Sequence, residues 1–171
     1  MGTQNGDDRK EPPSQRGREA SAPRRISVLV VDRARLEREA LVYFLRERAP
    51  ELDVRAVESI TDAANDEGKA PDIVLVSLKA TEITPPAIRQ AASALEAAFG
   101  RETPTILVLQ GESPAVDELA VIRLGARGCF PANLGAHMLV AAIRLVSSGG
   151  VFLSPQAVAL LAERHTDHGK P

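Results

Sequence analysis

Residues 26–31 read ISVLVV, and the chain runs on through Asp32 and Arg33 into a segment with helical spacing. A short run of β-branched and aliphatic residues is typical of a strand that is covered on both faces. Leucine, alanine and phenylalanine then recur three and four positions apart, and Pro50 closes the segment, which predicts an amphipathic helix over 34–48. The stretch therefore predicts a strand and a helix joined by a polar turn.

The same alternation of strand and helix continues along the chain. Further strands are predicted at 53–57, 72–78, 105–110 and 126–130, and further helices near 60–67, 88–99, 113–124 and 134–148. Strand and helix thus alternate five times, which predicts a parallel sheet with helices on both faces, a doubly wound α/β fold. An extended VFL at 151–153 leads to one more helix, from Pro155 to about Glu163.

The residues that follow the strands are where a functional site is expected. In doubly wound sheets, ligands bind beyond the carboxyl ends of the strands, where the strand order reverses. The residues at these ends are Asp32-Arg33, Ser77-Leu78-Lys79, Gln110-Gly111 and Pro131-Ala132. They include no nucleophile with an adjacent base, no metal-ligand cluster and no glycine-rich phosphate loop. The sequence therefore predicts neither an enzyme nor a bound cofactor.

The overall composition indicates one ordinary globular domain. Of the 171 residues, 44 % are hydrophobic and 26 % are charged, and the formal net charge is −2. This charge gives no reason to expect nucleic acid or a membrane surface as a partner. Cys129 is the single cysteine, so no internal disulfide can form. No apolar run approaches the ~20 residues of a membrane helix, and we expect a cytoplasmic protein.

The two ends of the chain differ from its middle. Residues 1–25 contain no Ile, Leu, Val or aromatic residue, so they cannot bury enough apolar area to fold. We interpret them as a disordered N-terminal arm, either a basic docking tail ending in Arg24-Arg25 or a solvated leader. The composition then changes abruptly, and the folded domain is expected at 26–153. Residues 154–171 are expected to form an exit helix and a polar tail.

Three stretches resemble a known family. They read VLVVDRARLEREAL (28–41), PDIVLVSLK (71–79) and LGARGCFPANLGAHMLVAAIRLVSSGGVFLSPQAVALL (124–161). They are similar to the opening, the central strand and the closing segment of bacterial response-regulator receiver domains of the NarL/FixJ–LuxR type, and the GG-V-x-LSP ending is the most specific feature. The resemblance implies a five-stranded flavodoxin-like (βα)₅ receiver fold with strand order 2-1-3-4-5.

The resemblance also implies a chemistry, from which this chain departs. In such receivers an aspartate takes a phosphoryl group from a histidine kinase; that aspartate and an acidic pair hold Mg²⁺, and a hydroxyl and a lysine bind the phosphoryl oxygens. The matching positions here are Asp32 and Arg33 for the acidic pair, Ser77 for the phosphoacceptor, Gln110 for the hydroxyl, Ala132 for the lysine and Cys129 for an aromatic switch residue. Lys79 completes this degenerate phosphorylation pocket.

Two questions about the pocket stay open from the sequence. With one carboxylate left and a cation beside it, Mg²⁺ affinity is expected to be very low. Arg33 either folds over Asp32 and fills the metal position with its own charge, or points to solvent. The Ser77 hydroxyl cannot replace a carboxylate as nucleophile without a base, although phosphorylation by a Ser/Thr kinase is a further alternative.

The expected function is that of a pseudo-receiver, which acts by protein–protein interaction or dimerisation in bacterial signal transduction or transcriptional regulation. The expected partner is a second copy, another response regulator or a kinase. Only residues 162–171 follow Leu161, so we expect no nucleic acid to be contacted by this chain itself. Alternatively, the chain is the receiver part of a LuxR-type DNA-binding regulator that works without phosphorylation, or a small-molecule sensor that uses the altered pocket.

Overall fold

The computed structural model describes residues 24–65, 69–79, 82–100, 103–110, 117–131 and 133–167. Its five parallel strands form one sheet in the order β2-β1-β3-β4-β5, which confirms the predicted order. The strands are β1 (Ile26–Val31), β2 (Leu52–Val57), β3 (Ile73–Lys79), β4 (Thr105–Gln110) and β5 (Gly128–Pro131). The helices are α1 (Arg35–Arg48), α2 (Ile60–Asn65), α3 (Pro85–Phe99), α4 (Glu118–Arg123), α5 (Ala136–Ser147) and α6 (Pro155–Asp167).

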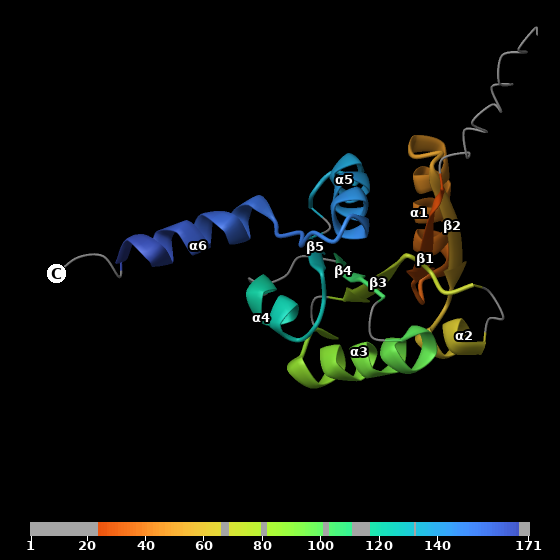
Figure 1. Ribbon diagram of the computed structural model, residues 1–171, viewed down its shortest axis with the longest axis horizontal. Coiled ribbons are helices and arrows are strands. Elements are labelled where there is room, and N and C mark those ends of the chain that lie inside the picture. The colour runs from red at the N-terminus through yellow and green to blue at the C-terminus, as the bar shows by residue number, and fades with distance from the viewer. Residues whose placement is uncertain are drawn as a thin grey trace, which may run out of the picture.

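Helices cover both faces of the sheet. Figure 1 shows α1 and α5 on one face and α2, α3 and α4 on the other. Val28 and Val30 of β1 pack in the core under α1 and α5, while Leu29 and Val31 pack in the core under the other three helices. Because successive side chains of a strand point to opposite faces, a strand between two helical layers must be apolar at every position. This requirement explains the uninterrupted apolar run from Val28 to Val31.

The register of the sheet places the polar strand ends side by side. Val31 of β1 pairs with Val76 of β3, so the residues that follow them, Asp32 and Ser77, lie next to each other. At the end of the same strand, Lys79 pairs with Gln110 of β4. Three segments that are far apart in the sequence therefore meet at one edge of the sheet.

Helix α4 begins later than the sequence predicted. The predicted start at Ser113-Pro114 lies outside the described residues. Asp117, the first described residue after this segment, is not helical. The Asp117 carboxylate caps the helix by accepting hydrogen bonds from the backbone N–H groups of Leu119 and Ala120, at 3.1 and 3.2 Å. Asp117 is thus the N-cap residue, since its carboxylate satisfies two otherwise free N–H groups of the first turn.

The last helix, α6, leads away from the body of the domain in Figure 1. It reaches Asp167, four residues beyond the predicted end at Glu163. Residues 1–23 of the predicted N-terminal arm lie outside the described residues. In the described part of the chain, no helix has both the length and the apolar character needed to cross a membrane.

Candidate functional site

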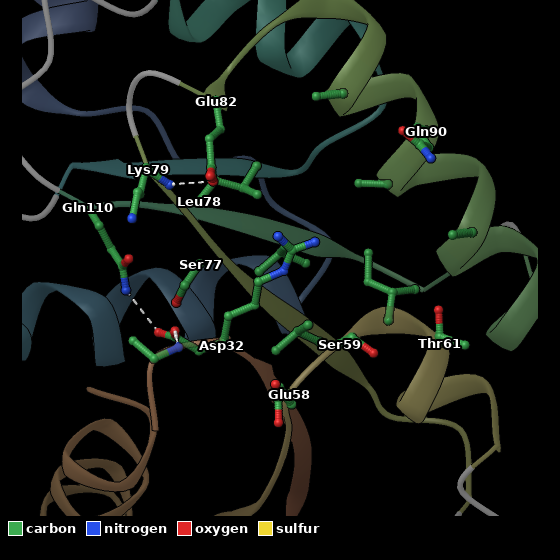
Figure 2. Close-up of a pocket in the computed structure, with 18 residues that line it drawn as sticks. Asp32, Glu58, Ser59, Thr61, Ser77, Leu78, Lys79, Glu82, Gln90 and Gln110 are labelled. Carbon is green, nitrogen blue, oxygen red and sulfur yellow. Dashed lines mark hydrogen bonds between the residues drawn. The ribbon is translucent and has the colours of Figure 1, made fainter. Parts of the chain in front are cut away.

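A cleft of about 630 Å³ opens at the carboxyl ends of β1 and β3 (Figure 2). Its floor is formed by the ends of these two strands, and one wall by the start of α2. The opposite wall is a face of α3 that presents Ala87, Gln90, Ala91 and Ala94. Five of the predicted site residues line the cleft, namely Asp32, Arg33, Ser77, Lys79 and Gln110. The cleft therefore lies at the strand ends where the topological argument expects a site, and its use as a site stays a prediction.

Asp32 is the buried acid of the cleft, with only 4 % of its surface exposed. Its Oδ1 accepts a hydrogen bond from the backbone N–H of Ala34 at 2.8 Å, and its Oδ2 accepts one from the Gln110 amide nitrogen at 2.9 Å. Its backbone N–H donates to the Val57 carbonyl at 3.2 Å, and its carbonyl accepts from the Arg38 guanidinium. Every polar group of Asp32 thus has a protein partner, as burial of a carboxylate requires.

Gln110, the last residue of β4, bridges two carboxylates. Its amide nitrogen donates to Asp32 and also to the Glu37 carboxylate on α1. A glutamine amide nitrogen has two hydrogens, so both donors are used. In Figure 2 the side chains of Asp32, Ser77 and Gln110 point toward one another, and the dashed line marks the bond from Gln110 to Asp32. A cation that bound Asp32 through Oδ2 would have to displace this amide.

The hypothesis that Arg33 folds over Asp32 is wrong. Arg33 lines the cleft with an exposed side chain, and no ion pair joins it to Asp32 among the described residues. The physical reason is that neutral N–H donors already occupy both oxygens of the Asp32 carboxylate. Gln110 stands where the resemblance places a hydroxyl residue, and the length of its side chain allows the amide to reach Asp32 from β4.

Ser77 stands in the middle of the site. Its side chain is half-buried and lies beside Asp32. Within the described part of the chain, no side chain acts as a hydrogen-bonding base for the Ser77 hydroxyl. An unactivated hydroxyl is a poor nucleophile and a weaker ligand for a hard cation than a carboxylate.

The two remaining predicted residues in β3 and β5 differ in accessibility. Lys79 is exposed at the end of β3, and its backbone N–H donates to the Glu82 carboxylate at 3.4 Å (Figure 2). Cys129 is fully buried in the core under α2, α3 and α4 instead of lining the cleft. Burial, and next the negative charge of Glu118, raises the pKa of the Cys129 thiol to about 12. Ala132 lies outside the described residues.

The donor set at this position does not fit Mg²⁺, the ion that the resemblance implies. Mg²⁺ prefers octahedral oxygen coordination that includes carboxylates. At the strand ends, Asp32 offers a carboxylate whose two oxygens already accept N–H groups, Ser77 offers a hydroxyl, and Arg33 adds a permanent positive charge. The Glu37 carboxylate shares the Gln110 amide with Asp32, and Glu58 and Glu82 also line the cleft. No group of three or more His, Cys, Asp or Glu side chains that could hold a metal exists among the described residues.

The fold is similar to that of solved response regulators. A two-component response regulator of the LuxR family from an Aurantimonas species aligns with a TM-score of 0.64 and 19 % identity, over 83 % of this chain and 99 % of that chain. A LuxR-family DNA-binding response regulator from Silicibacter pomeroyi aligns with a TM-score of 0.57 and 22 % identity, over 77 % of this chain and 98 % of that chain. A response regulator from Thermotoga maritima aligns with a TM-score of 0.53 and 18 % identity, over 72 % of this chain and 98 % of that chain.

These similarities concern the fold. No protein-family model matches the chain, and no curated protein matches it significantly. The structural alignments confirm the expectation of a flavodoxin-like receiver fold with a 2-1-3-4-5 sheet. Function must be argued from the residues of the site, because one fold serves many functions.

Proposed function

We propose that this chain is an atypical receiver, a pseudo-receiver that signals by protein–protein contact without aspartyl phosphorylation. The observation that carries the proposal is the hydrogen bond from Gln110 to Asp32 beside Ser77. It puts a neutral amide where a receiver needs a metal ion, and a hydroxyl where it needs a nucleophilic carboxylate. The domain is therefore held in one state by its own side chains.

Phosphoryl transfer depends on positioning and on charge stabilisation. The transferred group carries negative charge on its oxygens, and bound cations must offset that charge in the transition state. In this cleft each oxygen of Asp32, the acid retained at the metal position, already accepts an N–H group, and the matching lysine position holds Ala132. Arg33 and Lys79 supply positive charge that can bind an anion. Without a nucleophile beside them, however, the cleft cannot accept a phosphoryl group.

The outer face of α1 supports a role in contacts with another protein. Leu36, Ala40 and Tyr43 are four and three residues apart, so they lie on one side of the helix. All three are exposed, Leu36 to 80 % and Tyr43 to 70 %. An apolar stripe on a helix of a folded domain is a common contact surface. The partner we propose is a second copy, another response regulator or a kinase, in signal transduction or transcriptional regulation.

The phosphorylation part of the proposal is tested with acetyl phosphate and Mg²⁺, followed by intact-mass measurement. We expect no added phosphate on this chain. The matched control is a variant that restores the pattern with Arg33→Asp, Ser77→Asp, Gln110→Thr and Ala132→Lys, which should gain one phosphate. Phosphate on the unaltered chain overturns the proposal, and a peptide map then locates it.

The contact surface is tested by sedimentation equilibrium. If α1 pairs two copies, the mass rises with concentration, and Tyr43→Glu abolishes the rise. Arg48→Glu on the same helix is the matched control, because it changes charge outside the stripe. A chain that stays monomeric, alone and in mixtures with response regulators and kinases of its host, contradicts the contact role.

A small-molecule sensor is a second candidate, favoured by the cleft itself. Its volume of about 630 Å³ is in the range of ligand pockets, and the alanine face of α3 keeps it open. We propose to screen metabolites by thermal shift against this chain and against Ala91→Phe, which should fill the cleft. A compound that stabilises the first protein and not the second supports this function. Equal stabilisation of both proteins contradicts it.

The third candidate is the receiver part of a LuxR-type regulator. It rests on the similarity to structures described as LuxR-family response regulators, one of them DNA-binding. The observation that decides it is whether the open reading frame continues past Pro171 into a helix-turn-helix domain. A stop codon at that point contradicts this candidate.

A further inference from the structure

The segment between α5 and α6 is attached to the edge of the sheet. Phe152 forms an isolated parallel bridge with Gly128 of β5, and its backbone N–H donates to the Arg127 carbonyl at 2.9 Å. The Phe152 side chain is buried, and its ring centroid lies 5.7 Å from that of Phe130. The exit segment is therefore fixed to the domain two residues before Ser154.

Ser154 is buried, with 1 % of its surface exposed, and it immediately precedes α6. Its hydroxyl oxygen accepts the backbone N–H of Ala157 at 3.2 Å, and its carbonyl accepts that of Val158 at 3.1 Å. Serine at this position is a preferred N-cap because it satisfies a free N–H group of the first turn. The direction in which α6 leaves the domain is therefore set at Ser154.

Both donors of Ser154 go to one carboxylate of another helix. Its backbone N–H donates to Oε2 of Glu118 at 2.8 Å, and its hydroxyl donates to Oε1. Glu118 is the first residue of α4 and is 8 % exposed. A buried carboxylate needs hydrogen-bond donors, and here each oxygen of Glu118 receives one from Ser154. Helix α4 and the start of α6 thus depend on each other.

We propose that the Glu118–Ser154 contact is a latch that fixes the direction of α6 and couples it to α4. Among the α6 residues with described side chains, Ala157 of the first turn is the only buried one. The rest of the helix leads away from the body in Figure 1 and exposes about half of Val158 and Leu160. Glu118 is accordingly a positioning residue.

The latch gives the domain a signal path that does not use the cleft. Thirteen residues of helix span about 20 Å, so a rotation of about 10° at Ser154 displaces the far end of α6 by roughly 3–4 Å. A partner that shifts α4 breaks the contact and frees α6. Conversely, a partner that holds α6 stabilises α4, because coupling between two sites is reciprocal.

The direction of α6 is tested by double electron–electron resonance. Spin labels are placed at Leu160→Cys on α6 and Glu47→Cys on α1, both exposed, after Cys129→Ala, and the sample is diluted with unlabelled protein. We expect one narrow distance distribution. Glu118→Ala should broaden it roughly twofold or more, because the first turn loses its anchor. Glu118→Gln, which keeps an acceptor and gains a donor, should leave it narrow.

The second measurement is hydrogen exchange of the backbone amides. It also uses a second, milder variant, Ser154→Ala. In Glu118→Ala the amides of Ala157 and Val158 should exchange roughly tenfold faster, while those of β1 stay unchanged. In Ser154→Ala the Val121 amide of α4 should also exchange faster, which measures the coupling in the opposite direction. The latch is refuted if Glu118→Ala changes neither the distance distribution nor the exchange. It is also refuted if the control Glu51→Ala, which removes a contact with α5, loosens α6 equally.

Discussion

The Gln110→Ala variant tests the local physics of the cleft. The change removes the amide that donates to Asp32 at 2.9 Å and leaves the Ala34 N–H as the remaining donor to a carboxylate that is 4 % exposed. A hydrogen bond to a charged group is worth about 1.5–3 kcal/mol, and a buried acceptor without a partner costs more than an exposed one. Because Gln110 is half-buried and water can partly replace its amide, we expect the free energy of unfolding to fall by about 2 kcal/mol.

A loss of this size is measurable by urea and thermal unfolding. For a chain of this length, about 1 kcal/mol corresponds to roughly 2–4 °C in Tm, so the expected decrease is about 4–8 °C. The matched control is Gln90→Ala, the same substitution on the α3 wall of the same cleft, where the side chain is exposed. The control should change the free energy of unfolding by less than about 0.5 kcal/mol.

The comparison of the two glutamine variants decides the outcome. If Gln110→Ala is no more destabilising than Gln90→Ala, the amide does not hold Asp32, and our explanation of the closed site fails. A double-mutant cycle with Asp32→Ala isolates the pair: the two changes should couple by about 1 kcal/mol or more, since the residues are in direct contact. Additive effects would contradict the bond.

Three further predictions concern other parts of the molecule. The Cys129 thiol, whose pKa is raised to about 12 by burial, should react with a thiol reagent at pH 8 only after unfolding; rapid labelling of the native protein would contradict its burial. Leu75→Ala, in the central strand, should cost about 2–5 kcal/mol in urea unfolding, and a loss below about 1 kcal/mol would show that the core can collapse around the gap. The pKa of the Glu51 carboxyl is held below 4.5, first by the backbone N–H of Glu51 and then by Arg144. The contribution of this carboxylate to stability is therefore present above that pH and is lost as the pH falls. Glu51→Gln should therefore lower the free energy of unfolding by less than about 1 kcal/mol at pH 7, because the Glu51–Arg144 pair is exposed. The difference in stability between the two proteins should shrink in acid, and a difference that grows in acid would contradict this.

The fold could be predicted from the sequence because its central strands are buried on both faces. Val28 to Val31 have no polar position, and this pattern distinguishes a covered parallel strand from a half-exposed one. The start of α4 was predicted wrongly because Ser113-Pro114 matches a common capping pattern, whereas Asp117 provides the cap. Local patterns identify an element more reliably than its ends.

The residues of the cleft could be predicted, but not the bonds between them. Strand ends of a parallel sheet meet at one edge, so Asp32, Ser77 and Gln110 were expected together. Which side chain binds Asp32 depends on the register between β3 and β4 and on the reach of an amide across it. The contact between Glu118 and Ser154 was missed altogether, because it joins two helix starts that are 36 residues apart in the sequence.

The central claim is that the cleft no longer responds to metal and phosphate, and melting with and without Mg²⁺ and beryllofluoride tests it most directly. Specific binding at a hundredfold excess over Kd stabilises the folded state by about 2.7 kcal/mol. For a chain of this length that is a rise in Tm of roughly 5–11 °C. We predict no rise for this chain and a clear rise for the variant with the four restored residues. A rise of several degrees in the unaltered chain would contradict the account and show that the site still acts as a phosphorylation switch.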